Sequence, residues 1–509
     1  MESFNLGLFL TLWCTAFILT RAALASLFKK AGIAWYLACI PVLSWWYWIK
    51  LVGRPWWYMI GMVIPCVNIL FSFNITLDLL RSFGQNRFWQ HFLGIVFTFF
   101  YLPLIAFRKD VVFLGPAGKA EWRKKNIPPH AGTREWADAL LFAAYVAGGM
   151  RALYFDLYQI PTPSMESNLM VGDFLVVSRA KVGMRIPMTP ITVPVVAHKD
   201  LFGFKAFSDI VELPYMRLPG WYTIKNNDVI VFNWPADNND EFPVDKRDNY
   251  VKRCIGIPGD SVAIVEGIVY INGKKLPAVG RQQKQYVLGM KEPITTEFLS
   301  RYDLGVADPF RFRGSNGDDS VVALTYIINT YEENAAAIGN DPAVKRIVFN
   351  KLARQIGGHG PFLDSSVIGG RKIVSDLDNY GPFYLPKRGD KIQLTPGSFD
   401  FYGLAINNYE KADITMQGNK FFQNGEEVKS YTFKYGYYWM MGDNRFNSYD
   451  SRMWGYVPEN HIVGKPLFTF LSMKKAQEVI DGNPQRTETD EYLYKFQGIR
   501  WNRIMRAIR

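Results

Sequence analysis

The sequence predicts an α-helical, multi-span membrane region followed by a mainly β domain with a partly helical insertion. Three observations lead to this prediction. Ten of the 15 tryptophans of this 509-residue chain lie before residue 140, together with long apolar runs. After residue 158 the pattern changes to short β-type runs between turns, and helical periodicity interrupts them at about 318–357. The mean hydropathy of −0.04 therefore averages two unlike regions.

Five apolar stretches match the length of about 20 residues that a bilayer-spanning helix needs. A buried core helix is the alternative for each, but five stretches within 158 residues make that interpretation the weaker one. The third stretch is the weakest, because it contains Pro65, Asn68, Asn74 and Asp78. The stretches are Phe4–Leu27, Ile33–Leu51, Trp56–Leu79, Phe88–Phe107 and Trp136–Tyr158.

The first stretch has a second interpretation, a cleaved signal peptide, because Ala23-Leu24-Ala25 resembles a cleavage site. Its beginning, Met1-Glu2-Ser3, lacks the positive charge of such a leader, so we expect a retained anchor.

Basic residues predict the orientation of this region. The loop at 108–134 carries seven Lys and Arg residues against Asp110 and Glu121, so the positive-inside rule places it in the cytoplasm. The last span then leads outward, and the chain after Tyr158 lies on the far side of the membrane. The shorter loops are too balanced to orient the first four spans. Five spans put the N-terminus in the cytoplasm, and four do not.

The polar half is predicted to be a β domain with an insertion. Its strands include Phe174–Val177, Val229–Phe232, Ser261–Val265, Ile268–Ile271 and Lys391–Leu394, and Asn272-Gly273 and Asn424-Gly425 predict hairpin turns. Val321, Leu324, Ile327 and Ile328 recur at helical spacing. The C-terminal tail alternates basic and apolar residues, which fits either contact with anionic lipid or a frayed end. The predicted parts are a multi-span region at 1–135, a last anchor at 136–158, the β domain at 159–277, the insertion at 278–430, and the end of the β domain with a basic tail at 431–509.

Cysteine usage and net charge exclude several functions. Cys14, Cys39 and Cys66 lie in apolar runs, and Cys254 is alone in the polar half, so that half has neither a disulfide framework nor a cysteine-based metal site. The net charge of +12 suggests nucleic acid or a membrane surface as partner. The basic residues follow no nucleic-acid-binding module, so we discount nucleic acid.

A nucleophile candidate follows the fifth stretch, in Ile160-Pro-Thr-Pro-Ser-Met165. Pro161 and Pro163 stiffen this segment, because each fixes φ near −65°. A stiff extended segment can present Ser164 and offer its backbone to a peptide. An ordinary serine in a proline-rich loop is the alternative, and it is favoured for this motif alone.

A serine needs an activating base. None of the five histidines lies in a motif that suits this role, whereas Lys252 lies in an apolar strand before a Pro-Gly turn. Burial favours the neutral form of a lysine, which can then accept a hydroxyl proton. A solvated strand lysine is the alternative for Lys252 when it is considered alone.

A third segment, from Met441 to Pro458, is dense in short polar residues between aromatic strands. A hydroxyl such as Ser448 can orient a neutral amine, and Asp450 can pair with Arg452 to brace the loop. For Asp443, Asn444 and Arg445, a purely structural role is about equally plausible.

Four ordered motifs together resemble the bacterial type I signal peptidase, or leader peptidase, family. They are Pro-x-x-Ser-Met, Asp-Val-Ile-Val-Phe, Tyr-Val-Lys-Arg-x-Ile-Gly-x-Pro-Gly-Asp and Gly-Asp-Asn-Arg-x-Asn-Ser-x-Asp-Ser-Arg-x-Trp-Gly. They cover about 158–275 and 430–470, and as an ordered set they are highly specific.

The resemblance implies a signal-peptidase-like β-fold and a serine endopeptidase with a Ser/Lys dyad, which releases exported proteins by cleaving after small residues of the Ala-x-Ala type. It implies Ser164 as nucleophile, Lys252 as base, Thr162 and the Ser164 amide as the oxyanion hole, Ser448 as the residue that orients Lys252, and Asp450 and Arg452 as a supporting pair. It implies no cofactor and no metal. Signal peptides and membrane lipid are the expected partners, with proximity to the secretion translocon. The expected location is the inner membrane, as a multi-pass protein whose catalytic domain faces the periplasmic or outer side. The implied substrate pocket consists of Tyr158, Ile160, Met165, Leu169, Val231, Tyr250 and Val251.

The sequence departs from the family pattern at Ser167-Asn168 and at Phe446, which leaves the local loop geometry open. Two alternatives also remain. A self-cleaving regulatory peptidase would share the dyad but should carry a DNA-binding helix pair, and we see none. A non-catalytic membrane scaffold or transporter subunit would not need Ser164 and Lys252.

Overall fold

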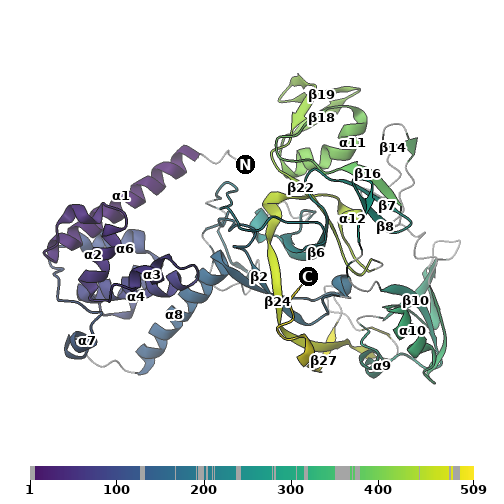
Figure 1. Cartoon of the computed structure of the whole chain (residues 1–509), viewed down its shortest axis with the longest axis horizontal. Helices are drawn as coiled ribbons and strands as arrows, with labels where there is room; N and C mark the ends of the chain where they lie inside the picture. Colours follow the sequence, from purple (N-terminus) through teal and green to yellow (C-terminus); the bar gives the residue numbers. More distant parts are fainter. Residues whose placement is uncertain are drawn as a thin grey trace. The chain divides into compact units, whose positions relative to one another are not determined.

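The computed structural model divides the chain into two units (Figure 1). A helical unit comprises Met1–Phe155 and Pro187–Pro214, and a β unit comprises Asp156–Ile186 and Tyr215–Arg509. The structure describes residues 6–126, 132–166, 168–190, 192, 200–201, 204–208, 210, 212–236, 242–277, 279, 283–304, 307–313, 319–349, 367–368, 371–372, 379–445, 447–480, 483–484 and 493–508.

Two long helices, α1 (Leu6–Lys30) and α8 (Gly132–Leu153), frame the helical unit. Shorter helices lie between them and pack on a core that includes Leu27, Phe28 and Leu79, all fully buried. These are η1 (Trp35–Ala38), α2 (Leu43–Val52), α3 (Tyr58–Val63), α4 (Val67–Ser82), α5 (Phe88–Val96), α6 (Thr98–Ala106) and α7 (Ala120–Asn126).

The structure breaks the middle three of the five predicted spans. Pro41 separates η1 from α2, and Pro65 separates α3 from α4, because proline lacks the N–H that would continue a helix. In the described part of the chain, no single helix passes a combined test of length and apolar character for crossing a membrane. Helices α5 and α6 pass it only together, with a 120° bend between them. Helix α8, which corresponds to the fifth predicted span, ends at Leu153, before the predicted boundary at Tyr158.

The β unit is built on a main sheet with the strand order β1-β2-β24-β5-β6-β22-β23, and β27 also pairs with β24. Strand β1 lies at an edge of this order, directly before the nucleophile candidate. The bounds are β1 (Phe155–Gln159), β2 (Asp173–Ser178), β24 (Ile462–Gln477), β5 (Val229–Asn233), β6 (Asn249–Gly256), β22 (Tyr437–Met441), β23 (Val457–Pro458) and β27 (Tyr494–Ile499).

A second sheet has the order β16 (Tyr380–Tyr384), β7 (Ser261–Val265), β8 (Ile268–Ile271) and β9 (Lys274–Lys275). The predicted turn at Asn272-Gly273 is confirmed, because Ile271 pairs with Lys274 and both turn residues have positive φ. The turn at Asn424-Gly425 is confirmed in the same way between β19 (Lys420–Gln423) and β20 (Glu426–Val428). The first of these strands also pairs with β18 (Ile414–Gln417).

The insertion corrects one prediction. Helical spacing predicted helix across about 318–357, but residues 319–330 and 344–349 form strands, β12 (Asp319–Thr330) and β13 (Val344–Phe349), and α10 (Glu332–Gly339) is the helix described between them. The register of β12 against β11 shifts between Pro309 and Arg311, and Leu324 has a φ of +53°. This irregularity disturbs the alternation of a strand, so the apolar residues recur at intervals that resemble a helix. The sheet has the order β11 (Ala307–Arg313), β12, β10 (Lys284–Met290) and β13 (Val344–Phe349), with α9 (Thr296–Arg301) and α10 (Glu332–Gly339) beside it.

The remaining described elements complete the β unit and the 187–214 segment. The C-terminal tail is not frayed, because the Ile508 amide donates to the Leu467 carbonyl (3.0 Å) and the Met505 amide to the Thr469 carbonyl (2.7 Å). The other elements are η2 (Pro163–Met165), η3 (Val244–Lys246), β14 (Val367–Ile368), β15 (Arg371–Lys372), β17 (Lys391–Gln393), α11 (Pro396–Leu404), η5 (Ala405–Tyr409), β21 (Ser430–Thr432), α12 (Ser451–Trp454), η6 (Glu459–His461), β25 (Val479–Ile480), β26 (Asn483–Pro484), η7 (Trp501–Arg503), β3 (Asp200–Leu201) and β4 (Phe204–Lys205).

Candidate active site

Ser164 lies in η2, a single 3-10 turn that follows the edge strand β1. Pro163 occupies the first position of this turn, where a proline costs no hydrogen bond. Asn444 holds the turn from the other side of the site. Its backbone N–H donates to the Ser164 carbonyl (3.1 Å), and its side-chain amide donates to the Pro163 carbonyl (3.3 Å). Asn444 therefore holds the backbone at both Pro163 and Ser164, and this positions the Ser164 hydroxyl.

Lys252 lies in β6, opposite Ile230 of β5, with only 3% of its surface exposed. Its Nζ lies 2.5 Å from the Ser164 Oγ, although the two residues are 88 positions apart in the chain. Burial lowers the pKa of Lys252 to about 8, while the nearby Asp450 acts in the opposite direction. The amine is thus largely neutral just above pH 8, and in that form it can accept the hydroxyl proton.

Asp450 and Arg452 form a buried ion pair beside the lysine. The Nε and Nη2 atoms of Arg452 each donate to the Asp450 carboxylate at 2.9 Å. The same carboxylate also accepts a hydrogen bond from the Gly442 N–H at 3.0 Å. Burial alone would raise the pKa of Asp450, but the charge and hydrogen bonds of Arg452 and the Gly442 N–H hold it below its usual value. Arg452 also donates to the Arg445 carbonyl at 2.8 Å, so the pair holds the backbone of this loop at Arg445 as well as at Gly442.

A second buried pair ties this loop to the strand that carries Lys252. Arg253 donates to both oxygens of Asp443 at 2.6 Å, and 1% of Arg253 is exposed. Strands β6 and β22 pair alongside it, with Arg253 opposite Met441. Sequence reasoning left Asp443 and Asn444 undecided, but their position within the Gly-Asp-Asn motif was a usable signal.

Gly442 was not singled out from the sequence, yet it is closely enclosed. A Cβ atom on Gly442 would lie 2.2 Å from the Ser448 Oγ and 2.5 Å from the Ser164 carbonyl oxygen. Both distances are shorter than real Cβ contacts, so only glycine fits between the two serines.

The other predicted site residues lie in the same region. The Thr162 Oγ1 is 3.5 Å from the Ser164 Oγ. The Ser448 Oγ is buried without a hydrogen-bond partner in the described part of the chain, so no bond from it to Lys252 is present there. Ser167 and Phe446, where the sequence departs from the family pattern, lie outside the described residues.

Six of the seven predicted pocket residues contribute to one hydrophobic cluster. Tyr250 packs in a neighbouring cluster with Phe232 and Trp454. The six residues are Tyr158, Ile160, Met165, Leu169, Val231 and Val251. Of these, Met165 and Leu169 are fully buried, so they offer no exposed surface to a substrate.

The histidines do not change this picture. His461 is buried, with its Nδ1 2.8 Å from the Asn460 side chain. His91 lies in the helical unit, 3.3 Å from Asp138. His130, His198 and His359 fall outside the described residues. Among the residues described, no group of three or more His, Cys, Asp or Glu side chains could hold a metal ion.

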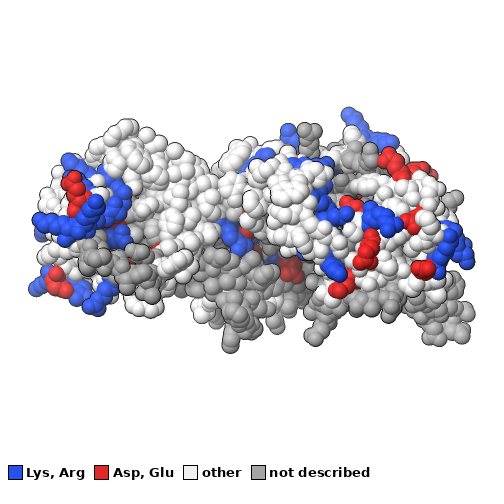
Figure 2. Space-filling model, turned by 90° about the horizontal axis from the view of Figure 1, so that it is seen from below, with Lys and Arg blue, Asp and Glu red and all other residues white. Residues whose placement is uncertain are grey.

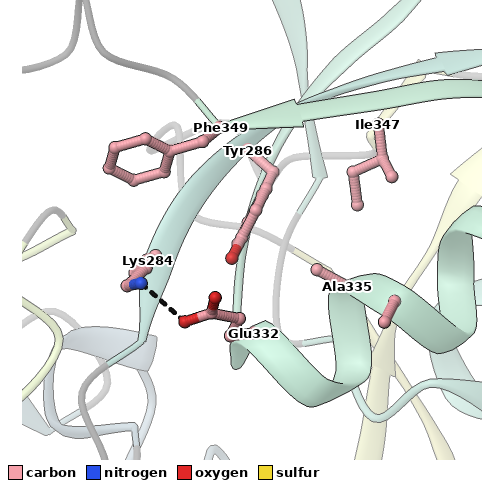
Figure 3. Close-up of a pocket in the computed structure, with 7 residues that line it drawn as sticks. Lys284, Tyr286, Glu332, Ala335, Ile347 and Phe349 are labelled. Carbon is pink, nitrogen blue, oxygen red and sulfur yellow. Dashed lines mark hydrogen bonds and ion pairs between the residues drawn. The ribbon is translucent and has the colours of Figure 1, made fainter.

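An open pocket of about 390 Å³ lies elsewhere, in the insertion (Figure 3). Tyr286 and Phe349 line it from β10 and β13, and α10 contributes Glu332. Lys284 and Glu332 form an ion pair at its margin (2.7 Å). It contains none of the candidate catalytic residues.

Comparison with known proteins gives two family matches. The family described as "Signal peptidase, peptidase S26" matches residues 133–320 and 387–471, which is more than half of the chain. The gap between the two segments falls within the insertion. A family of unknown function, DUF5684, matches residues 36–116 of the helical unit.

Individual relatives are similar over long segments. Signal peptidase I of Buchnera aphidicola (subsp. Acyrthosiphon pisum) is 24% identical over 328 residues, which cover 64% of this chain and 72% of the relative. Signal peptidase I of Haemophilus influenzae is 24% identical over 363 residues, covering 70% and 74%. Signal peptidase I of Helicobacter pylori (strain J99) is 37% identical over 101 residues, covering 19% and 31%.

Proposed function

This chain belongs to the signal peptidase family, peptidase S26, and from this membership we propose that Ser164 and Lys252 are the catalytic dyad with which it cleaves. It is a serine endopeptidase that removes signal peptides from exported proteins. The observation that carries the dyad is the 2.5 Å distance between the Lys252 Nζ and the Ser164 Oγ.

The reaction follows from this geometry. The neutral amine of Lys252 takes the hydroxyl proton while the Ser164 Oγ attacks the scissile carbonyl carbon. The Ser164 N–H and the Thr162 hydroxyl stabilise the oxygen on which negative charge develops. The lysine then returns its proton to the departing amine. In the second step the Lys252 amine deprotonates a water molecule, which attacks the acyl-ester, and the proton passes to the departing Ser164 Oγ.

The edge strand β1 supports recognition of an extended peptide. In the described sheet β1 pairs on one side only, with β2, so its free backbone can accept a signal peptide as an added strand. In the apolar cluster beside Ser164, Ile160, Met165 and Leu169 are at most 3% exposed, which leaves only shallow contacts for substrate side chains. Small residues of the Ala-x-Ala type satisfy that restriction.

The helical unit is the proposed membrane anchor. It exposes many large apolar side chains, including Trp56 (62% exposed), Trp89 (68%) and Phe100 (79%), and a bilayer would cover such a surface. The basic loop at 108–134 supports a cytoplasmic position for that loop and an outward position for the β unit. We therefore propose an inner-membrane location for the enzyme, with proximity to the secretion translocon.

The function is tested by cleavage of an exported precursor by the purified full chain in detergent. The expected kcat/KM is half-maximal near pH 8 and falls as the pH drops, because protonation of Lys252 removes the base. A precursor with Phe in place of Ala immediately before the cleavage point is the matched control and should remain uncut. A rate that does not change between pH 5 and pH 9 would exclude a neutral-lysine base, and failure to cut the Ala precursor would exclude the function.

Gly442→Ala is expected to lower kcat/KM by about 100-fold, because the new methyl group displaces the Ser164 carbonyl or the Ser448 hydroxyl, and small misplacements of reacting groups cost rates of that order. Gly403→Ala, in α11, is the control, since its Cβ would meet its nearest neighbours at 3.4–3.5 Å. Wild-type activity in Gly442→Ala would show that this close packing does not position the nucleophile.

A further inference from the structure

The ends of several helices in the helical unit meet at one place. The Lys30 Nζ, at the end of α1, donates to the carbonyl oxygens of Arg108 (2.5 Å) and Val111 (2.8 Å), just after α6. The Leu114 amide donates to the Ser82 carbonyl at the end of α4 (2.9 Å). The Gly118 amide donates to the Val52 carbonyl at the end of α2 (2.7 Å). Helices α1, α2, α4 and α6 therefore all finish at the same end of the unit.

This end is strongly basic. Figure 2 shows Lys and Arg side chains gathered at one end of the helical unit, while most of the rest of its visible surface is uncharged. We call it the basic end, and it comprises Lys29, Lys30, Lys50, Arg54, Arg108, Lys109, Lys119, Arg123, Lys124 and Lys125.

The segment between α1 and α3 turns back before it reaches the opposite end. At its turn, the Ala38 carbonyl and the Ser44 hydroxyl both accept from Arg21 of α1 (3.2 and 3.0 Å). Arg21 precedes Lys30 by nine residues, about 14 Å along a helix. The hydrocarbon core of a bilayer is about 30 Å thick, so this turn lies near its middle.

The segment of α3 and α4 also begins and ends at the basic end. Arg54, just before α3, binds Asp78 in the last turns of α4 (2.6 Å). Helix α4 runs antiparallel to α8, since Ser72 contacts Tyr145 (3.2 Å) and Asn68 contacts Tyr154 (3.3 Å). The turn between α3 and α4 thus lies beside the end of α8, away from the basic end.

The segment of α5 and α6 also turns back toward the basic end. Each helix has nine residues, about 14 Å, and the 120° bend turns the chain back. Its return is fixed because the Ala106 carbonyl, at the end of α6, accepts from Ser26 of α1 (2.9 Å). The chain therefore passes from one end of the unit to the other without returning only in α1 and α8, among the described helices, because each of the three segments between them comes back to the basic end.

We infer that the three apolar segments between α1 and α8 enter the bilayer from the cytoplasmic face and return to it as helical hairpins. This inference rests on the proposed membrane anchor and its orientation. The basic end faces the anionic cytoplasmic lipids, and α1 starts on the same side of the membrane as the β unit. The five-span alternative would instead place the loops around Lys29 and Arg87 outside.

Two features make such hairpins tolerable in lipid. A broken helix leaves backbone groups without partners, which is accepted at membrane depth only where the protein satisfies them. Arg21 donates to the Ala38 carbonyl at the first turn, and at the second the Asn68 N–H donates to the Ile64 carbonyl (3.0 Å). The exposed side chains at the turns are apolar, as lipid contact requires: they include Ile40 (41% exposed), Val63 (67%) and Phe97 (47%).

Labelling with a membrane-impermeant maleimide in intact cells tests this arrangement. Cys14, Cys39 and Cys66 are replaced by serine, while the buried Cys254 is retained. Single cysteines are then introduced as Ser3→Cys, Lys29→Cys and Arg87→Cys in the full chain. Lys124→Cys and Lys429→Cys are the controls for the inner and outer faces.

We expect labelling of Ser3→Cys and Lys429→Cys in intact cells, and labelling of the other three only after permeabilisation. Labelling of Lys29→Cys or Arg87→Cys in intact cells, or protection of Ser3→Cys, would overturn the hairpins while leaving the proposed function intact. Protection of Lys429→Cys would instead overturn the proposed orientation of the β unit, and the hairpin inference with it.

Discussion

Lys252→Met is expected to abolish cleavage, with a loss of kcat on the order of 10⁴-fold or more, and to leave the folded protein at least as stable as the wild type. Methionine fills a similar volume without an amine, so Ser164 loses the group that accepts its proton. The measurement is the rate of precursor cleavage by the full chain in detergent, together with a thermal melt.

The stability effect has a defined sign. Burial lowers the pKa of Lys252 from 10.5 to about 8, so the folded state binds this proton less tightly than the unfolded state. Below about pH 8 the buried lysine is protonated in the folded state, and this lowers the free energy of unfolding by about 3 kcal/mol. The penalty fades as the pH rises from about 8 to about 10.5. Methionine removes the penalty, although the lost hydrogen bond to Ser164 offsets part of the gain.

Ser164→Ala is the matched control for this prediction. It should lose as much activity as Lys252→Met, but without the gain in melting temperature below pH 8, because the buried amine remains. Retained cleavage in Lys252→Met would show that another group is the base. A lower melting temperature for Lys252→Met than for Ser164→Ala at pH 7 would contradict the burial argument.

Arg452→Leu is expected to lower the free energy of unfolding by about 3–5 kcal/mol, because it leaves the fully buried Asp450 carboxylate without its counter-ion. In the wild type Arg452 holds the pKa of Asp450 below its usual value, so the pair stabilises the fold above about pH 4 and this contribution fades as the pH falls further. The measurement is denaturant unfolding at pH 7.

A double-mutant cycle separates the ion pair from general damage to the loop. Combining Asp450→Asn with Arg452→Leu should recover part of the lost stability, since no unpaired charge then remains. The control is Lys420→Leu, whose partner Glu427 lies at 3.1 Å on the surface and for which a change within about 0.5 kcal/mol is expected. Purely additive effects at 450 and 452 would contradict the pairing.

Local sequence was sufficient for many features of the β unit. Asn-Gly pairs favour the positive φ angles of a two-residue hairpin, so the turns at 272–273 and 424–425 were predictable. Local pattern failed for β12, because a register shift changes the spacing of apolar residues. For the three middle apolar stretches, apolar length did not reveal that each is divided into two helices, and their crossing of a membrane stays a prediction.

The sequence by itself determined the division into an apolar helical part and a β part, the family, and the candidate serine and lysine, since composition and motif order are local properties of the chain. Only the tertiary structure decided that the Ser164 hydroxyl and the buried Lys252 amine meet, that Gly442 has no room for a side chain, and that four helices finish at one basic end. These features depend on contacts between residues far apart in the chain, and neither hydrophobic period nor turn chemistry reports which distant segments come together.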